Sequence, residues 1–128
     1  MPSYEQITKQ IADVGVYVKN LPTDELKDLP EVLHETESLR GIARGLYTNQ
    51  SGLLLATNER VIFYDKGRQW GSHVEEFRYD KITSIEYATG QTGGTITINT
   101  TNNPAKIEMV PNIYCKPFVE AVRALMPA

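Results

Sequence analysis

Apolar residues recur at helical spacing near the start of the chain and at strand spacing through most of the remainder. Four of them follow one another at intervals that place them on one stripe of an amphipathic helix: Ile7, Ile11, Val14 and Val18. Ser3 and Gln6 form a capping-box signature just before this stripe. The pattern therefore predicts a helix over residues 3–19.

A second helical segment is expected to begin at Thr23, a good N-cap residue followed by two acidic residues. Leucines supply its apolar side: Leu26, Leu29 and Leu33. Pro30 fits the first turn of a new helix, so the pattern permits one helix or two short pieces. The helical region is expected to end near residues 34–35.

From about residue 37 onward, short apolar or alternating runs are separated by turn residues, a pattern typical of antiparallel strands. The predicted strands cover residues 39–47, 53–56, 60–64, 73–77, 82–88, 95–100 and 106–110. In the last strand, Ile107 and Met109 are expected to face inward. A final amphipathic helix follows Pro111, with one apolar face made by Tyr114, Phe118, Val122 and Leu125.

Even spacing and short turns indicate a meander, and a sheet of seven such strands tends to curl on itself. The closing helix is the expected plug for its open end. No linker or composition shift divides the chain, so we expect one compact unit with a helical segment over 1–35 and a barrel domain over 36–128. If two runs pair differently, a flattened sheet with helices on one face is the alternative.

Composition and charge narrow the function classes. The chain has 128 residues, 41% hydrophobic and 23% charged, which predicts a single globular domain. Its net charge of −3 disfavours binding to nucleic acid or to an anionic membrane surface. Binding to either of these depends on clustered Lys and Arg residues. Cys115 is the only cysteine, and no apolar run approaches the roughly 20 residues of a membrane span. We therefore expect a cytoplasmic protein without disulfides.

Residue types that carry chemistry are sparse. Cys115, His73 and Asp80 are the types of a nucleophile, a base and an orienting acid, but nothing in their spacing brings them together. His34 and His73 have no partner at a metal-ligand spacing, so no metal site and no cofactor are predicted. The glycine-rich run over 90–94 precedes an alternating strand, which indicates a hairpin turn and not a phosphate loop.

Several stretches in this order are similar to a known family. They are residues 29–33, 54–64, 70–72 and 77–85, together with the final helix. The chain resembles the bacterial pleckstrin-homology (PH)-like domains of the YokE-like type over roughly residues 30 to 127. The resemblance implies an α+β fold: a PH-like seven-stranded antiparallel barrel with a C-terminal capping helix, preceded by N-terminal helices. It also implies a binding module without catalytic residues.

Lipid binding is the alternative that this resemblance invites. PH domains that hold phosphoinositides gather Lys and Arg around the loop that joins the first two strands. Here that loop, residues 47–52, has no basic residue, and Arg40 and Arg44 lie further back in the strand. A peripheral membrane or phospholipid-binding role is therefore disfavoured relative to binding of a protein.

The candidate interaction surface combines the helical stripe with one loop. Ile7, Ile11, Val14 and Val18 either pack on the barrel of their own chain or pair with a second chain. Trp70, beside Arg68, either anchors a partner or closes its loop against the barrel. The predicted function is protein–protein interaction or self-assembly, including a homo-oligomer. Exposed sheet edges near the first strands would suit strand addition by a peptide.

Overall fold

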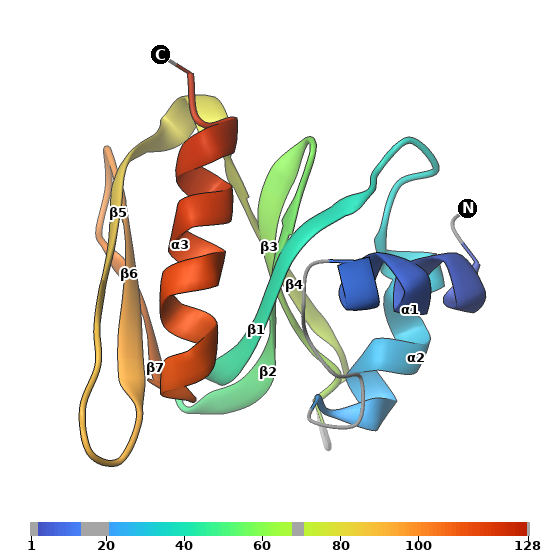
Figure 1. Cartoon of the computed structure of the whole chain (residues 1–128), viewed down its shortest axis with the longest axis horizontal. Coiled ribbons are helices and arrows are strands. Elements are labelled where there is room, and N and C mark those ends of the chain that lie inside the picture. The colour runs from blue at the N-terminus through green and yellow to red at the C-terminus, as the bar shows by residue number, and fades with distance from the viewer. Residues whose placement is uncertain (1–2, 14–20, 68–70, 128) are drawn as a thin grey trace.

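A computed structural model describes residues 3–13, 21–67 and 71–127, which form one curled antiparallel sheet and three α-helices (Figure 1). The helices are α1 (Tyr4–Asp13), α2 (Thr23–Val32) and α3 (Asn112–Leu125). The strands are β1 (Leu39–Tyr47), β2 (Gln50–Thr57), β3 (Arg60–Asp65), β4 (His73–Arg78), β5 (Ile82–Ala88), β6 (Gly94–Thr100) and β7 (Ala105–Val110). A 3₁₀ turn, η2 (Tyr79–Lys81), connects β4 to β5. The predicted α+β fold with seven strands and a closing helix is confirmed.

The strand order is β4-β3-β2-β1-β7-β6-β5, so the sheet is a half-barrel whose two wings meet where β1 pairs with β7. That seam is short, with Leu46 opposite Glu108 and Tyr47 opposite Ile107. In Figure 1, α3 stands between the β5–β6 wing and the wing of β1 and β2. The expectation of free edges near the first strands was wrong, because the edge strands are β4 and β5 and β1 lies at the centre.

A glycine allows the two wings to meet. A Cβ atom on Gly45 would lie 2.7 Å from the Cγ2 atom of Ile107 and 2.8 Å from the carbonyl oxygen of Glu108. Carbon atoms in contact normally stay about 3.5–4.0 Å apart. A larger residue at this position would therefore push β7 away from β1.

One continuous core fills the half-barrel. Its largest fully buried side chains come from β2, β3, β6 and all three α-helices, and they include Phe63, Phe118, Leu54, Ile62 and Ile98. The predicted apolar face of the last helix is largely confirmed, with Tyr114, Phe118 and Val122 buried and Leu125 partly buried. Burying these side chains supplies the hydrophobic driving force that keeps α3 against the sheet.

The N-terminal helices pack on the same core. Ser3 and Gln6 make both predicted capping hydrogen bonds at the start of α1, at 2.8 and 3.1 Å. The Gln10 side chain accepts a hydrogen bond of 2.7 Å from the backbone N–H of Leu39, which ties α1 to the start of β1. Helix α2 begins at Thr23 as expected, but Pro22 occupies the N-cap, and the helix continues through Pro30 in one piece.

Strand β7 departs from strict alternation at Met109. Met109 was expected to face inward, but its side chain is exposed and its φ of 55° lies in the left-handed region. The register shifts at this point, between the pairs that Gly94 and Ile96 make with β7. Such a bulge shifts the alternation of inward and outward side chains by one residue, so that Val110 is buried in place of Met109.

Candidate functional site

A groove of about 650 Å³ opens between β4 and the turn that joins β6 to β7. Its lining comes from four parts of the chain: Tyr47, Glu75, Glu76, Phe77, Arg78, Lys81 and residues 100–105. This volume lies within the range of about 300–1,000 Å³ that is usual for ligand sites. The groove is therefore large enough to hold a peptide segment or a small molecule.

The wall on the β4 side is the edge of the strand. Four consecutive residues of β4, from Glu75 to Arg78, line the groove. Successive side chains of a strand point to opposite faces, so a groove on one face would be lined by every second residue only. Within the described part of the chain, β4 pairs with β3 alone, so its other row of N–H and C=O groups faces this groove.

Aromatic rings support the groove from below. The Tyr47 ring meets the Phe63 ring edge-on at a centroid distance of 5.2 Å and the Phe77 ring at 6.3 Å. Its hydroxyl donates a hydrogen bond of 2.6 Å to the Glu75 carboxylate. Burial, followed by the neighbouring Glu75 carboxylate, raises the pKa of Tyr47 to about 12. The phenol therefore stays protonated and keeps donating at neutral pH.

The charged side chains that line the groove differ in whether they already have a partner within the chain. Glu75 accepts from Tyr47, and Glu76 forms an ion pair of 2.8 Å with Arg60. Arg78 makes only a long contact of 3.3 Å to Asp80, and both side chains are exposed. Lys81 has no ion-pair partner among the described residues. Both carboxylates are thus engaged within the chain, whereas the cations remain available.

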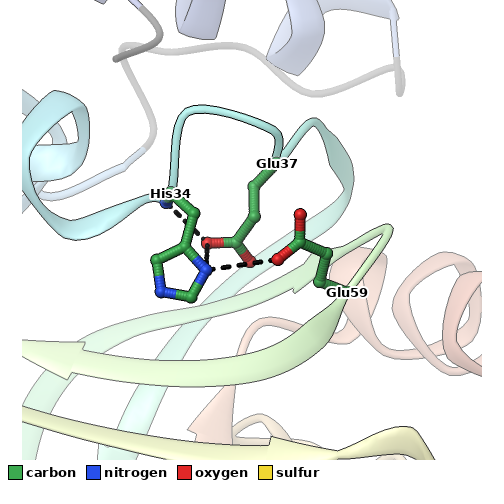
Figure 2. A group of neighbouring side chains, drawn as sticks. All are labelled: His34, Glu37 and Glu59. Atoms are coloured by element: carbon green, nitrogen blue, oxygen red, sulfur yellow. Dashed lines mark hydrogen bonds and ion pairs between the residues drawn. The ribbon is translucent and has the colours of Figure 1, made fainter.

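A second polar cluster lies where the segment between α2 and β1 packs on the β2–β3 hairpin. Figure 2 shows His34, Glu37 and Glu59, with the imidazole facing both carboxylates. The Nδ1 atom of His34 lies 3.2 Å from Glu59 and 3.4 Å from Glu37. The ligand atoms of the three residues lie within 4.8 Å of one another, a spacing that a metal ion could bridge.

The hydrogen bonds of Glu37 argue against a metal ion at this cluster. Its Oε1 atom accepts from the His34 backbone N–H at 2.7 Å and from Arg60 at 2.9 Å. Its Oε2 atom accepts from the Thr57 hydroxyl at 2.6 Å and from Arg60 at 3.1 Å. A carboxylate offers about four lone-pair sites, so none remains for a metal, and a cation would sit against the Arg60 guanidinium.

The same contacts explain the Thr-Asn-x-Arg motif that the sequence places at 57–60. The Thr57 hydroxyl accepts from the backbone N–H groups of Glu59 and Arg60, which closes the β2–β3 turn. The Asn58 side chain bonds the backbone of Thr36 and Ser38. Burial disfavours the charge on Glu37, but the bonds from Arg60, Thr57 and His34 outweigh it and lower its pKa. The motif therefore holds the hairpin to the segment before β1.

The residues of the predicted interaction surface separate into two groups. Ile7 and Ile11 are fully buried within the core of their own chain. They therefore contribute no exposed apolar surface. Val14, Val18, Arg68 and Trp70 lie outside the described residues.

The three residues that could have formed a catalytic triad have separate partners. Cys115 is buried in α3, where burial raises the pKa of its thiol and so weakens it as a nucleophile. His73 faces Asp65 at 3.2 Å at the start of β4, and Asp80 contacts Arg78 in η2. The glycine-rich run forms the predicted β5–β6 hairpin turn.

The groove was missed in the sequence because its walls come from segments far apart along the chain. One local signal pointed to it. Glu75 and Glu76 are adjacent in a strand, which places a carboxylate on each face. Charged residues on the inward face are a common feature of edge strands, because they discourage uncontrolled pairing. That signal marks β4 as an edge, although it does not reveal what lies opposite.

Comparisons with known proteins agree with this architecture. The family described as Bacterial PH domain matches residues 13–124. A crystal structure of a DUF1696 family protein with a pleckstrin-homology domain, from Shewanella loihica PV-4, superposes with a TM-score of 0.52 at 17% identity. The superposition covers 84% of this chain and 95% of that one, which shows a shared fold. No curated protein matches the chain.

Proposed function

The chain belongs to the bacterial PH domain family, and on this premise we propose that it is a non-catalytic module that binds a protein through the β4 groove. We further assign it to the YokE-like type, on the motifs over 54–64 and 77–85. The observation that carries the proposal is the groove itself, which combines a strand edge that no described strand pairs with and the aromatic rings of Tyr47 and Phe77.

The absence of a reactive cluster supports a binding role over catalysis. Among the described residues, the buried carboxylate of Glu37 is fully hydrogen-bonded, and the thiol of Cys115, buried in the core, has one polar contact, to a backbone carbonyl at 3.9 Å. An active site usually keeps titratable groups with perturbed pKa values in a cleft, where they can reach a substrate. In the groove, Tyr47 has a shifted pKa, and its hydroxyl is already engaged in a hydrogen bond to Glu75.

The charges also favour a protein over a phospholipid headgroup. The tight β1–β2 turn at Thr48 and Asn49 has no basic residue. The groove itself offers two cations, Arg78 and Lys81, and Arg78 already contacts Asp80, whereas a multiply charged phosphate headgroup needs several cationic donors. In the described part of the chain, no helix is long and apolar enough to cross a membrane.

Site-specific photo-crosslinking in the native host tests the proposal. A photoreactive side chain replaces Asn103, an exposed residue of the groove wall, and in a control chain it replaces Gln91, an exposed residue of the β5–β6 turn. We expect protein adducts from position 103 and few or none from position 91. An adduct of twice the chain mass would identify a second copy as the partner.

Equal labelling from both positions, or none from position 103, would contradict the proposed function. Sedimentation with vesicles of phosphatidylcholine and phosphatidylglycerol tests the lipid alternative separately. Binding to these vesicles that weakens with added salt, together with no protein adduct from position 103, would replace the protein ligand by a membrane.

A further inference from the structure

Resting on the proposed function, we propose that the ligand is an extended protein segment that pairs with β4 as an eighth strand and places an acidic side chain on Lys81. The first support is the state of the β4 backbone. All six residues of β4 pair with β3 on one side, from His73 opposite Asp65 to Arg78 opposite Arg60. On the other side, the described residues provide no strand.

The regular pairing with β3 leaves the outer edge of β4 ready to accept a strand. In an antiparallel pair, alternate residues direct their N–H and C=O groups away from the partner strand. The register between β3 and β4 runs without a shift from Arg60 to Asp65, so β4 has no bulge that would twist its edge out of reach. An extended segment would find a row of donors and acceptors at regular spacing.

The other edge strand of the sheet, β5, is less accessible to an incoming segment than β4. The Arg123 side chain from α3 donates a hydrogen bond of 2.9 Å to the backbone carbonyl of Ile85, in the middle of β5. This contact occupies a backbone acceptor of β5 and places a long side chain beside that strand. In β4, the side chains of Glu75 and Glu76 bond Tyr47 and Arg60, and among the described residues no side chain bonds the β4 backbone.

The charge around the groove selects an acidic segment. Glu75 and Glu76 are engaged by Tyr47 and Arg60, so they offer little to a basic ligand. Lys81 is the last residue of η2, the turn that follows β4, and it lines the groove without an ion-pair partner among the residues that the structure describes. A carboxylate on the incoming strand would give this ammonium group a charge-assisted hydrogen bond.

The test uses random-sequence peptides of about six to ten residues, displayed on phage and selected on the immobilised full chain. Selected peptides are synthesised and titrated by calorimetry against the wild type, Lys81→Glu and Lys27→Glu. The Lys27 control carries the same charge change on an exposed residue of α2 that is outside the groove. We expect Asp or Glu in the selected peptides, binding about fivefold to tenfold weaker for Lys81→Glu, and no change for Lys27→Glu.

Strand pairing is tested by N-methylation of alternate peptide amides in two complementary phases. Because only one set of peptide amides can face β4, methylation of one phase should abolish binding and methylation of the other should not. Sensitivity to Lys81→Glu with tolerance of both methylated phases would overturn strand addition while leaving a peptide-binding groove. Failure to select any peptide, or equal effects of the two lysine variants, would also overturn the inference. The crosslinking from position 103 tests the proposed function independently.

Discussion

The hydroxyl of Tyr47 donates a 2.6 Å hydrogen bond to the carboxylate of Glu75 and so joins the end of β1 to β4. Strands β2 and β3 lie between these two strands in the sheet order. In a flat sheet, strands three places apart would be about 14 Å from each other, out of reach of a tyrosine. The bond therefore exists because the sheet is curled, and the same curl forms the floor of the groove.

Replacement of Tyr47 by Phe should remove this bond and retain the ring. Because Glu75 is partly exposed and regains water, we expect a loss of about 0.5–1.5 kcal/mol in the free energy of unfolding, measured by urea denaturation. Tyr87→Phe removes a hydroxyl that makes no hydrogen bond to any described residue and should stay within about 0.5 kcal/mol of the wild type. Equal losses for the two variants would show that the Tyr47 bond does not stabilise the fold.

The raised pKa of Tyr47 predicts a specific loss of stability in alkali. Its pKa is about 12 in the folded chain and about 10 when unfolded, so rising pH ionises the unfolded state first. The stabilising difference is complete below pH 10 and disappears as the pH rises towards 12. Tyr47→Phe should therefore lose less stability between about pH 9 and pH 11 than the wild type. Urea denaturation at both pH values checks this, and parallel losses in the two proteins would contradict it.

The buried pair of Glu37 and Arg60 should be the most sensitive polar contact of the fold. Arg60→Met leaves the Glu37 carboxylate buried without its two bonds from the guanidinium, and we expect a loss of about 3–5 kcal/mol. Arg78→Met breaks an exposed contact and should cost less than about 1 kcal/mol. Urea denaturation of both variants compares them, and similar losses would show that burial does not decide the effect.

The lowered pKa of Glu37 predicts part of the acid sensitivity of the chain. A carboxylate with a folded pKa below its unfolded value stabilises the fold above the unfolded pKa, and this stabilisation is lost as pH falls through the folded pKa. Glu37→Gln should be less stable than the wild type near pH 7 but should lose less stability between about pH 5 and pH 3. Glu31→Gln, at an exposed position of α2, is the control. An unchanged pH dependence in Glu37→Gln would contradict the assignment.

Much of the fold follows from local patterns. Alternation and turn residues predicted β1 and β5 with the bounds that the structure has, and the capping box at Ser3 was confirmed. These features depend on residues close together in sequence, where backbone preferences act directly. Met109 shows the limit, because a bulge depends on the partner strand and reverses which side chain faces inward.

The groove could not be predicted from the sequence of any one strand, because it forms between segments that are far apart along the chain. The pairing of β1 with β7 decides which strands become edges, and it rests on the close approach at Gly45, far from β4 in sequence. Lys81, Tyr47 and the turn over 100–105 meet only after the sheet has curled. The candidate surface predicted on Ile7 and Ile11 came from an apolar stripe, and the core buries both residues. Periodicity alone does not tell which partner buries an apolar face.

The most direct test of the account is amide hydrogen exchange of the free chain, resolved residue by residue along β2, β3 and β4. An open edge predicts that alternate amides of β4 exchange much faster than those of β2 and β3, which are paired on both sides. If every amide of β4 were protected as strongly as those of β3, that edge would already be covered, and a groove that accepts a partner along it would be contradicted.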